Sequence, residues 1–129
     1  MTLLLIAALF AARADELTKS SPEVDVGKRL VAAIKGKAEF HDADFMKPLV
    51  DADKAALRRF AACKVSNINH AGTPLPNNVF TVVEDPNQIV IGLDCKRVPY
   101  STPAGISLVF ENGKVVKVET HNADLLRVK

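Results

Sequence analysis

The chain has 129 residues, of which 48% are hydrophobic and 25% are charged, and its formal net charge is +2. This length is typical of one domain, and the composition supplies enough apolar residues for a packed core, which argues against a disordered chain. A net charge this small, spread over both signs, is not typical of proteins that bind nucleic acid or an anionic membrane surface.

The N-terminus differs in composition from the rest of the chain. Leu3–Ala12 is an uninterrupted apolar run, followed by Ala12-Arg13-Ala14 and two acidic residues. Ten helical residues rise about 15 Å, half of a bilayer core, so the run is too short to anchor the mature protein. The pattern indicates a signal peptide, residues 1–14, cleaved after Ala14. The alternative is a buried N-terminal helix, because no Lys or Arg precedes the run.

Export has consequences for the mature protein. We expect a linker over residues 15–21, a single domain over residues 22–129, and a periplasmic or secreted location. The two cysteines, Cys63 and Cys95, then favour a disulfide, which closes a loop of about 30 residues and stabilises the fold by roughly 3–4 kcal/mol. A catalytic free thiol is the alternative, although neither cysteine belongs to a CxxC pair.

The first half of the domain is expected to be helical. Ser21-Pro22-Glu23 is a helix start, and apolar residues at helical spacing continue it to near Gly36. A short turn is expected over Asp44–Lys47. A further helix, capped by Asp51, is expected to run to about Ala62, with its apolar side formed by Leu57, Phe60 and Ala61.

From Cys63 onward the apolar period changes to two, which predicts strands. Five strands are expected, with a turn at Asp85–Gln88 and another at Asn112-Gly113, since Asn-Gly between alternating runs favours a hairpin. A long loop, Lys96–Ala104, carries the single tyrosine, Tyr100. The expected strands are Lys64–His70, Val79–Glu84, Ile89–Cys95, Ile106–Phe110 and Lys114–His121.

Helices followed by strands predict an α+β fold, with N-terminal helices packed on one face of a curved antiparallel sheet of about five strands. The segment Gly105–Glu119 (GISLVFENGKVVKVE) resembles the last hairpin of the nuclear transport factor 2-like superfamily, and the opening helix and preceding strands fit as well. This resemblance implies a cone-shaped sheet around an internal pocket. Ala38–Val50 is too short for the strand pair that the family usually has there, so the chain resembles a trimmed member or a cystatin-like relative.

Motifs for phosphate loops, nucleophile elbows, zinc proteases and paired CxxC sites are absent. His41, His70 and His121 are scattered along the chain, so no metal site and no cofactor are expected. Asp42 and Asp44 are better explained as helix caps than as calcium ligands. Tyr100 would pack with a bonded hydroxyl or lie over a pocket.

The last strand carries the main candidates for acid–base chemistry. Alternation places Val116, Val118 and Thr120 on one face and Val115, Lys117, Glu119 and His121 on the other, with Glu119 and His121 about 6–7 Å apart. Beside a concave face they could act as a proton-transfer pair, because a nearby carboxylate raises the pKa of an imidazole. The alternative is a solvated strand face. His70 is a third, weaker candidate.

Two functions follow from these observations. The first is a non-catalytic module that binds a small apolar ligand, a peptide or a partner protein. The second is an isomerase-, dehydratase- or hydrolase-type enzyme, which the resemblance also implies, with Glu119 or His121 in the pocket. A homodimer through the exposed face of the sheet is a further possibility. A fold alone does not choose between these functions.

Overall fold

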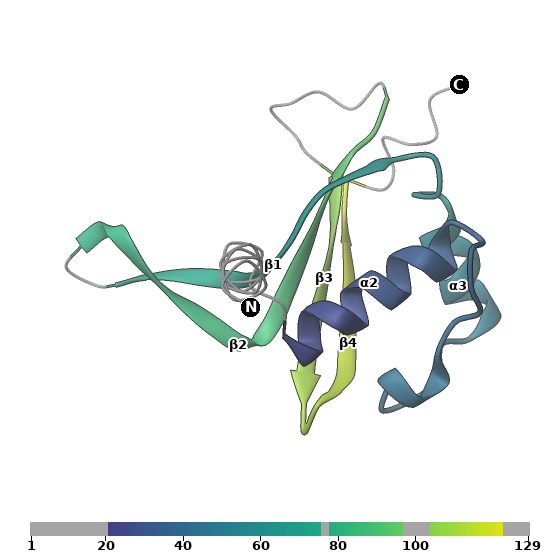
Figure 1. Ribbon diagram of the computed structural model, residues 1–129, viewed down its shortest axis with the longest axis horizontal. Coiled ribbons are helices and arrows are strands. Elements are labelled where there is room, and N and C mark those ends of the chain that lie inside the picture. Colours follow the sequence, from purple (N-terminus) through teal and green to yellow (C-terminus); the bar gives the residue numbers. More distant parts are fainter. Residues whose placement is uncertain (1–20, 76–77, 97–103, 123–129) are drawn as a thin grey trace, which may run out of the picture.

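The computed structural model describes residues 21–75, 78–96 and 104–122 and confirms an α+β fold in which helices precede strands (Figure 1). The expected signal peptide, its cleavage site at Ala14 and Tyr100 lie outside these residues. The elements are α2 (Pro22–Ile34), the 3₁₀ turn η1 (Asp42–Asp44), α3 (Asp51–Arg58), β1 (Lys64–Leu75), β2 (Asn78–Asp94), β3 (Ala104–Glu111) and β4 (Lys114–His121).

Helix α2 begins as the sequence predicts. The hydroxyl of Ser21 accepts a hydrogen bond from the backbone N–H of Val24 at 3.1 Å, and Pro22 occupies the first turn. The chain leaves the helix through Gly36, whose φ of +75° suits glycine. Gly27 faces the sheet so closely that a Cβ there would lie 2.7 Å from Cδ1 of Ile89. The helix therefore packs directly on β2.

The sheet is an antiparallel meander of four strands in the order β1-β2-β3-β4. The expected count of about five is too high, because Val79–Glu84 and Ile89–Cys95 are parts of the single strand β2. The turn predicted at Asp85–Gln88 is wrong. The chain reverses instead between Leu75 and Asn78, so β1 also continues past His70.

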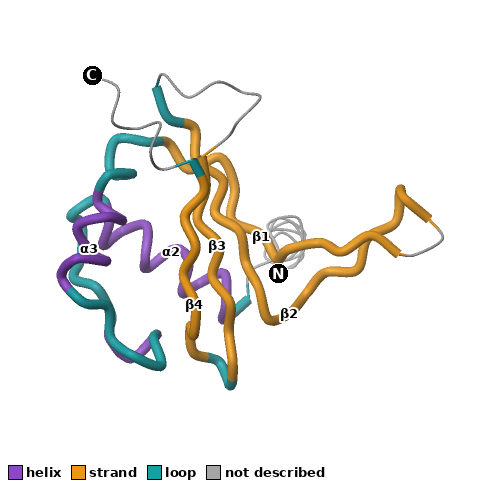
Figure 2. Tube along the Cα trace, turned by 180° about the vertical axis from the view of Figure 1, so that it is seen from behind, coloured by secondary structure: helices purple, strands orange, loops and turns teal. Residues whose placement is uncertain are grey.

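Asp85–Gln88 form a bulge in place of a turn. His70 pairs with Ile89 and Gly72 pairs with Glu84, so these four residues lie opposite Ala71 alone. The carboxylate of Asp85 accepts a hydrogen bond from the N–H of Asn87 at 2.8 Å, which is the local bond that favours a turn. Strand β2 continues through this bulge because it pairs with β1 both before and after Asp85–Gln88. Beyond the bulge, the outer part of the β1–β2 hairpin extends away from the helices (Figures 1 and 2).

The second helix is shorter than expected and has a different cap. Val50 precedes α3 as the N-cap and Asp51 is the first helical residue; the helix ends at Arg58 rather than Ala62. Residues 59–62 form turns, with the N–H of Cys63 donating to the carbonyl of Phe60. Leu57 and Phe60 are buried as predicted, whereas Ala61 is exposed. The short turn comes earlier than expected, at Asp42–Asp44.

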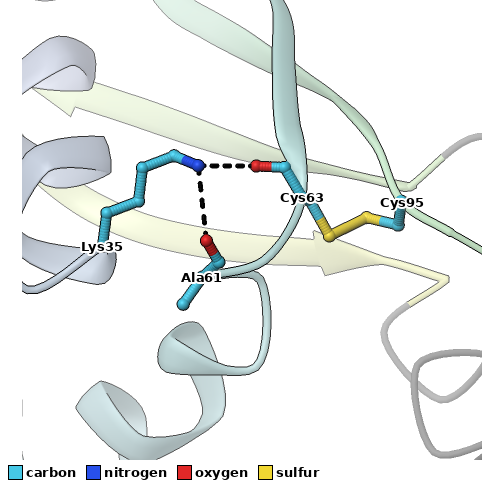
Figure 3. Close-up of a disulfide and its surroundings, with 4 residues drawn as sticks. All are labelled: Lys35, Ala61, Cys63 and Cys95. Atoms are coloured by element: carbon cyan, nitrogen blue, oxygen red, sulfur yellow. Dashed lines mark hydrogen bonds between the residues drawn. A yellow bond between two sulfur atoms is a disulfide. The ribbon is translucent and has the colours of Figure 1, made fainter.

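The hydrophobic core lies between the helices and one face of the sheet, here called the inner face. The Cys63–Cys95 disulfide is present and both residues are buried (Figure 3). The disulfide lies next to the pair Lys64↔Asp94, at the end of the β1–β2 ladder, and it links the two strands there. The ammonium of Lys35, one residue after α2, donates to the carbonyls of Cys63 at 2.7 Å and Ala61 at 3.3 Å. The end of α2 is thereby tied to the disulfide.

Candidate apolar cleft at the edge of the sheet

A cleft of about 570 Å³ lies between the last strand, helix α3 and the segment that precedes this helix. Where the structure describes side-chain exposure, at residues 21–72, 84–96 and 104–122, three large hydrophobic side chains are exposed: Met46 (48% exposed), Val50 (60%) and Val116 (38%). All three line this cleft. Exposed apolar side chains are ordinary when scattered, but a group of them around one concave surface is typical of a binding site. The lining residues are Phe45–Val50, Asp53, Ala56, Leu57, Val115–Val118 and Thr120.

The segment Phe45–Val50 forms one end of the cleft and is held there by backbone and side-chain contacts. Phe45 is buried and forms an isolated parallel bridge with Val115, and the N–H of Met46 donates to the carbonyl of Val115 at 2.9 Å. Pro48, two residues later, has no N–H with which to continue such pairing. The chain therefore leaves β4 after one bridge, and Met46 stays exposed at the cleft.

The guanidinium of Arg29 fixes the start of this segment. It donates to both carboxylate oxygens of Asp44, each at 2.8 Å, from the solvent-facing side of α2. This hydrogen bond raises the pKa of Arg29. The assignment of Asp44 to a helix cap is thus wrong, because its carboxylate binds an arginine from another element.

A bulge in β4 presents Val116 to the cleft. The pairs Phe110↔Val115 and Val109↔Lys117 leave Val116 without a partner of its own on β3. The extra residue changes the alternation, so Val115 joins the inner face and is 2% exposed. The prediction that Val115 shares a face with Lys117 is therefore wrong. Val118 and Thr120 pair with Leu108 and Ile106, so they share one face as predicted, and this face is the inner one.

Helix α3 lines the cleft together with β4, since it contributes Asp53, Ala56 and Leu57 to the lining. The order β1-β2-β3-β4 makes β4 an edge strand, and its only bridge on the free side, among the described residues, is the one between Phe45 and Val115. In the part of the chain that the structure describes, the cleft therefore lies beside an edge to which no further strand is paired.

Glu119 and His121 lie on the outer face of the sheet, away from the helices. Glu119 pairs with Ser107 and His121 pairs with Gly105, both of which alternate with the core residues of β3. The ammonium of Lys117 lies 2.7 Å from the carboxylate of Glu119, and this hydrogen bond lowers the pKa of Glu119. The strand thus presents a charged, solvated pair on this face, and neither Glu119 nor His121 lines the cleft.

A serine that the sequence analysis did not single out lies beside His121. The Oγ of Ser107 is 2.9 Å from Nε2 of His121. A hydroxyl and an imidazole at this distance can exchange a proton, which is one requirement of nucleophilic catalysis. Ser107 is only 4% exposed, however, and the neighbouring carboxylate of Glu119 binds Lys117. Cross-strand pairing accounts for this bond without a reaction.

His70 joins two elements rather than lining the cleft. Its Nε2 is 2.8 Å from the hydroxyl of Ser21, and its Nδ1 is 3.1 Å from the carbonyl of Asp85. Because a carbonyl only accepts, Nδ1 donates to Asp85, while Nε2 pairs with the hydroxyl of Ser21. The ring fastens the cap of α2 to the bulge of β2. His41 is exposed, and the described residues contain no group of three metal-ligating side chains.

The cleft-lining residues Met46, Val50 and Val116 were not predicted as functional. Two features of the sequence bear on them: the apolar residues Met46 and Val50 on either side of Pro48, and the consecutive valines Val115 and Val116 in a strand that otherwise alternates.

Comparison with known proteins adds nothing to the assignment, since no protein family, curated protein or solved structure matches the chain. Among the described residues, no helix is long and apolar enough to cross a membrane.

Proposed function

We propose that the chain is an exported, non-catalytic binding module that takes an apolar partner in the cleft beside β4. The observation that carries this proposal is that Met46, Val50 and Val116 are large hydrophobic side chains exposed to solvent and all line one cleft. Apolar surface left in water costs about 25 cal/mol per Å², and a partner that covers it recovers this free energy. Such a cost, gathered at one place, favours a binding function.

Two further observations support the export and the non-catalytic role. The disulfide favours an oxidising compartment, in agreement with the N-terminal apolar run. The polar residues that line the cleft are Lys47, Asp53, Thr120 and Lys117, whose ammonium is directed to Glu119 on the outer face; the histidines and Glu119 lie elsewhere. A ligand in this cleft would therefore meet mostly hydrocarbon.

The proposal is tested with an apolar fluorescent probe, anilinonaphthalene sulfonate, and the full chain. We expect Met46→Asp and Val50→Asp each to weaken probe binding several-fold, because a carboxylate in the cleft opposes apolar contact and repels the sulfonate. Ala38→Asp, at an exposed position outside the cleft, is the matched control for added charge. Equal probe binding by all four proteins, each folded by circular dichroism, would contradict the proposal.

A hydrolase is the second candidate function, and the hydrogen bond between Ser107 and His121 is the observation in its favour. It requires Ser107 to react as a nucleophile. A fluorophosphonate reagent distinguishes the two functions, because it labels activated serines. Labelling that is lost in Ser107→Ala and in His121→Gln would establish the enzyme; we expect no labelling of the full chain.

A further inference from the structure

The free edge of β4 exposes backbone hydrogen-bonding groups beside the apolar cleft. The carbonyl of Val115 faces this edge, since it accepts from Met46. In an antiparallel pair the backbone groups point alternately toward and away from the neighbour. Leu108 and Ile106 follow Phe110 along β3 in steps of two, so their pairs with Val118 and Thr120 are of the same kind as the pair Phe110↔Val115. The backbone groups of Val118 and Thr120 are therefore also directed away from β3. The N–H and C=O of Val118 and Thr120 thus face the cleft side of the sheet.

These groups and the apolar residues suit one kind of partner. A small apolar molecule would cover Met46, Val50 and Val116 but would leave the backbone of Val118 and Thr120 unpaired. An extended peptide satisfies both, because its main chain pairs with β4 while alternate side chains enter the cleft. The Phe45–Val115 bridge already has this form, with main chain bound to the same edge before Pro48 ends the pairing.

The segment Phe45–Met46 favours a short single strand over a second copy of the chain. Its main chain already occupies the free edge of β4 at Val115. A second copy that paired its β4 antiparallel with this one at Val118 would bring its last strand residues to Val115, where they would collide with this segment. A short peptide can end before it reaches Val115.

We infer that the cleft is a strand-binding slot: an extended peptide segment of another protein, with aliphatic side chains at alternate positions, adds antiparallel to the free edge of β4, beside the cleft that α3 lines. This inference rests on the proposed binding function and specifies its partner. Lys117 and Glu119, on the outer face, add charge selectivity. A peptide that reads basic–aliphatic–acidic places its acid opposite Lys117 and its base opposite Glu119.

The probe is a fluorescein-labelled peptide, KVVKVET, which is the sequence of β4 without its last residue and has this order of charges. Aligned antiparallel, the valine between its Lys and Glu, here called the central valine, lies opposite Val118, and the peptide ends before Val115, where Met46 is bound. We expect the full chain to bind it, and N-methylation of the central valine to weaken binding at least about tenfold, because the methyl group removes a donor and blocks the edge. N-methylation of the preceding lysine, whose N–H points away from β4, is the matched control and leaves binding unchanged.

Three more measurements test the alignment. Exchanging the central Lys and Glu of the peptide is expected to weaken binding about tenfold, since like charges then lie opposite each other. Bound peptide is expected to slow hydrogen exchange at the N–H of Val118 and Thr120 but not at Glu119, whose N–H already faces β3. Thr120→Pro removes a free edge N–H and is expected to abolish peptide binding, while Thr120→Val retains it.

Several results would overturn the inference. In the binding experiments, these results are the absence of peptide binding, equal binding of the two N-methylated peptides, and tighter binding of the charge-exchanged peptide. In light scattering, the result is a dimer of the chain that the peptide dissociates. If the peptide fails while Met46→Asp still weakens the binding of anilinonaphthalene sulfonate, the strand-binding slot is wrong and the binding function stands. If the peptide does not bind and Met46→Asp leaves the binding of anilinonaphthalene sulfonate unchanged, the proposed binding function fails as well.

Discussion

Arg29 on α2 donates to both carboxylate oxygens of Asp44, at 2.8 Å each, and so joins the first helix to the segment that ends at the cleft. The side chain of Asp44 is 10% exposed and that of Arg29 is 48% exposed. Hydrogen bonds between charged groups contribute more than neutral ones, but solvent at the arginine reduces the gain.

We expect Arg29→Gln to lower the free energy of unfolding by about 1–2 kcal/mol, because Asp44 then keeps a poorly exposed carboxylate without its partner. Urea unfolding followed by circular dichroism measures the change. Lys28→Gln, at the adjacent exposed position, removes the same charge and should leave stability almost unchanged. Equal effects of the two substitutions would show that net charge, not the pair, is responsible.

Lys117 sets the protonation of Glu119. Its hydrogen bond lowers the pKa of Glu119, so this carboxylate favours the folded state above the pKa that it has in the unfolded chain, and the contribution is lost as the pH falls through the folded-state pKa. We expect Lys117→Met to raise the pKa of Glu119 in an NMR titration of its carboxyl carbon. Lys114→Met is the control, since Lys114 donates instead to the carbonyl of Ala43. A shift of similar size in both variants would contradict the assignment.

Gly27 allows α2 to approach the sheet. A Cβ at this position would lie 2.7 Å from Cδ1 of Ile89 and 3.1 Å from Cγ2 of Ile68, so a larger side chain must displace the helix. We expect Gly27→Leu to destabilise the fold by about 2–3 kcal/mol in urea unfolding, despite the higher helix propensity of leucine. Lys28→Leu adds the same side chain on the exposed side and should not destabilise. Unchanged stability of Gly27→Leu would mean that the helix has room to move.

The disulfide is expected to contribute about 3–4 kcal/mol by restricting the unfolded chain. The double variant Cys63→Ser, Cys95→Ser should therefore unfold at lower urea concentration, and the wild-type chain with reductant should behave in the same way. Alkylation of the denatured chain without reductant should modify neither cysteine. Two alkylated thiols in protein purified from its native compartment would contradict both the disulfide and the proposed export.

Capping and turn residues predicted the ends of elements correctly where the fold contains the cap or turn that these residues favour. Ser21 caps α2, Gly36 ends it, and Asn112-Gly113 turns between β3 and β4 with φ values of +51° and +77°. Asp85–Gln88 carries an equally strong turn signal, and its Asx hydrogen bond does form. The strand continues because β1 pairs with β2 on both sides of the bulge, which is a long-range effect that no short window contains.

The cleft was beyond the reach of the sequence for a related reason. The bulge at Val116, the approach of Phe45 to Val115 and the position of α3 beside the cleft each depend on segments far apart in the chain. Simple alternation placed the residues of β4 correctly from Lys117 onward and failed before the bulge. Asp44 was assigned to a local role because its partnership with Arg29, 15 positions away, depends on how the helix packs.

The bulge opposite Ala71 divides the long β1–β2 hairpin into two parts with different neighbours. The part of the hairpin next to the core is covered by α2, hydrogen-bonded to the start of α2 through His70, and closed at its end by the disulfide. The outer part projects as a two-stranded ribbon (Figure 2). Four residues opposite one interrupt the ladder, so twisting or shortening the ribbon transmits little strain to the body. The hairpin tip is consequently a natural place for grafting a tag or an epitope, since paired residues can be added or removed there while the core keeps its register.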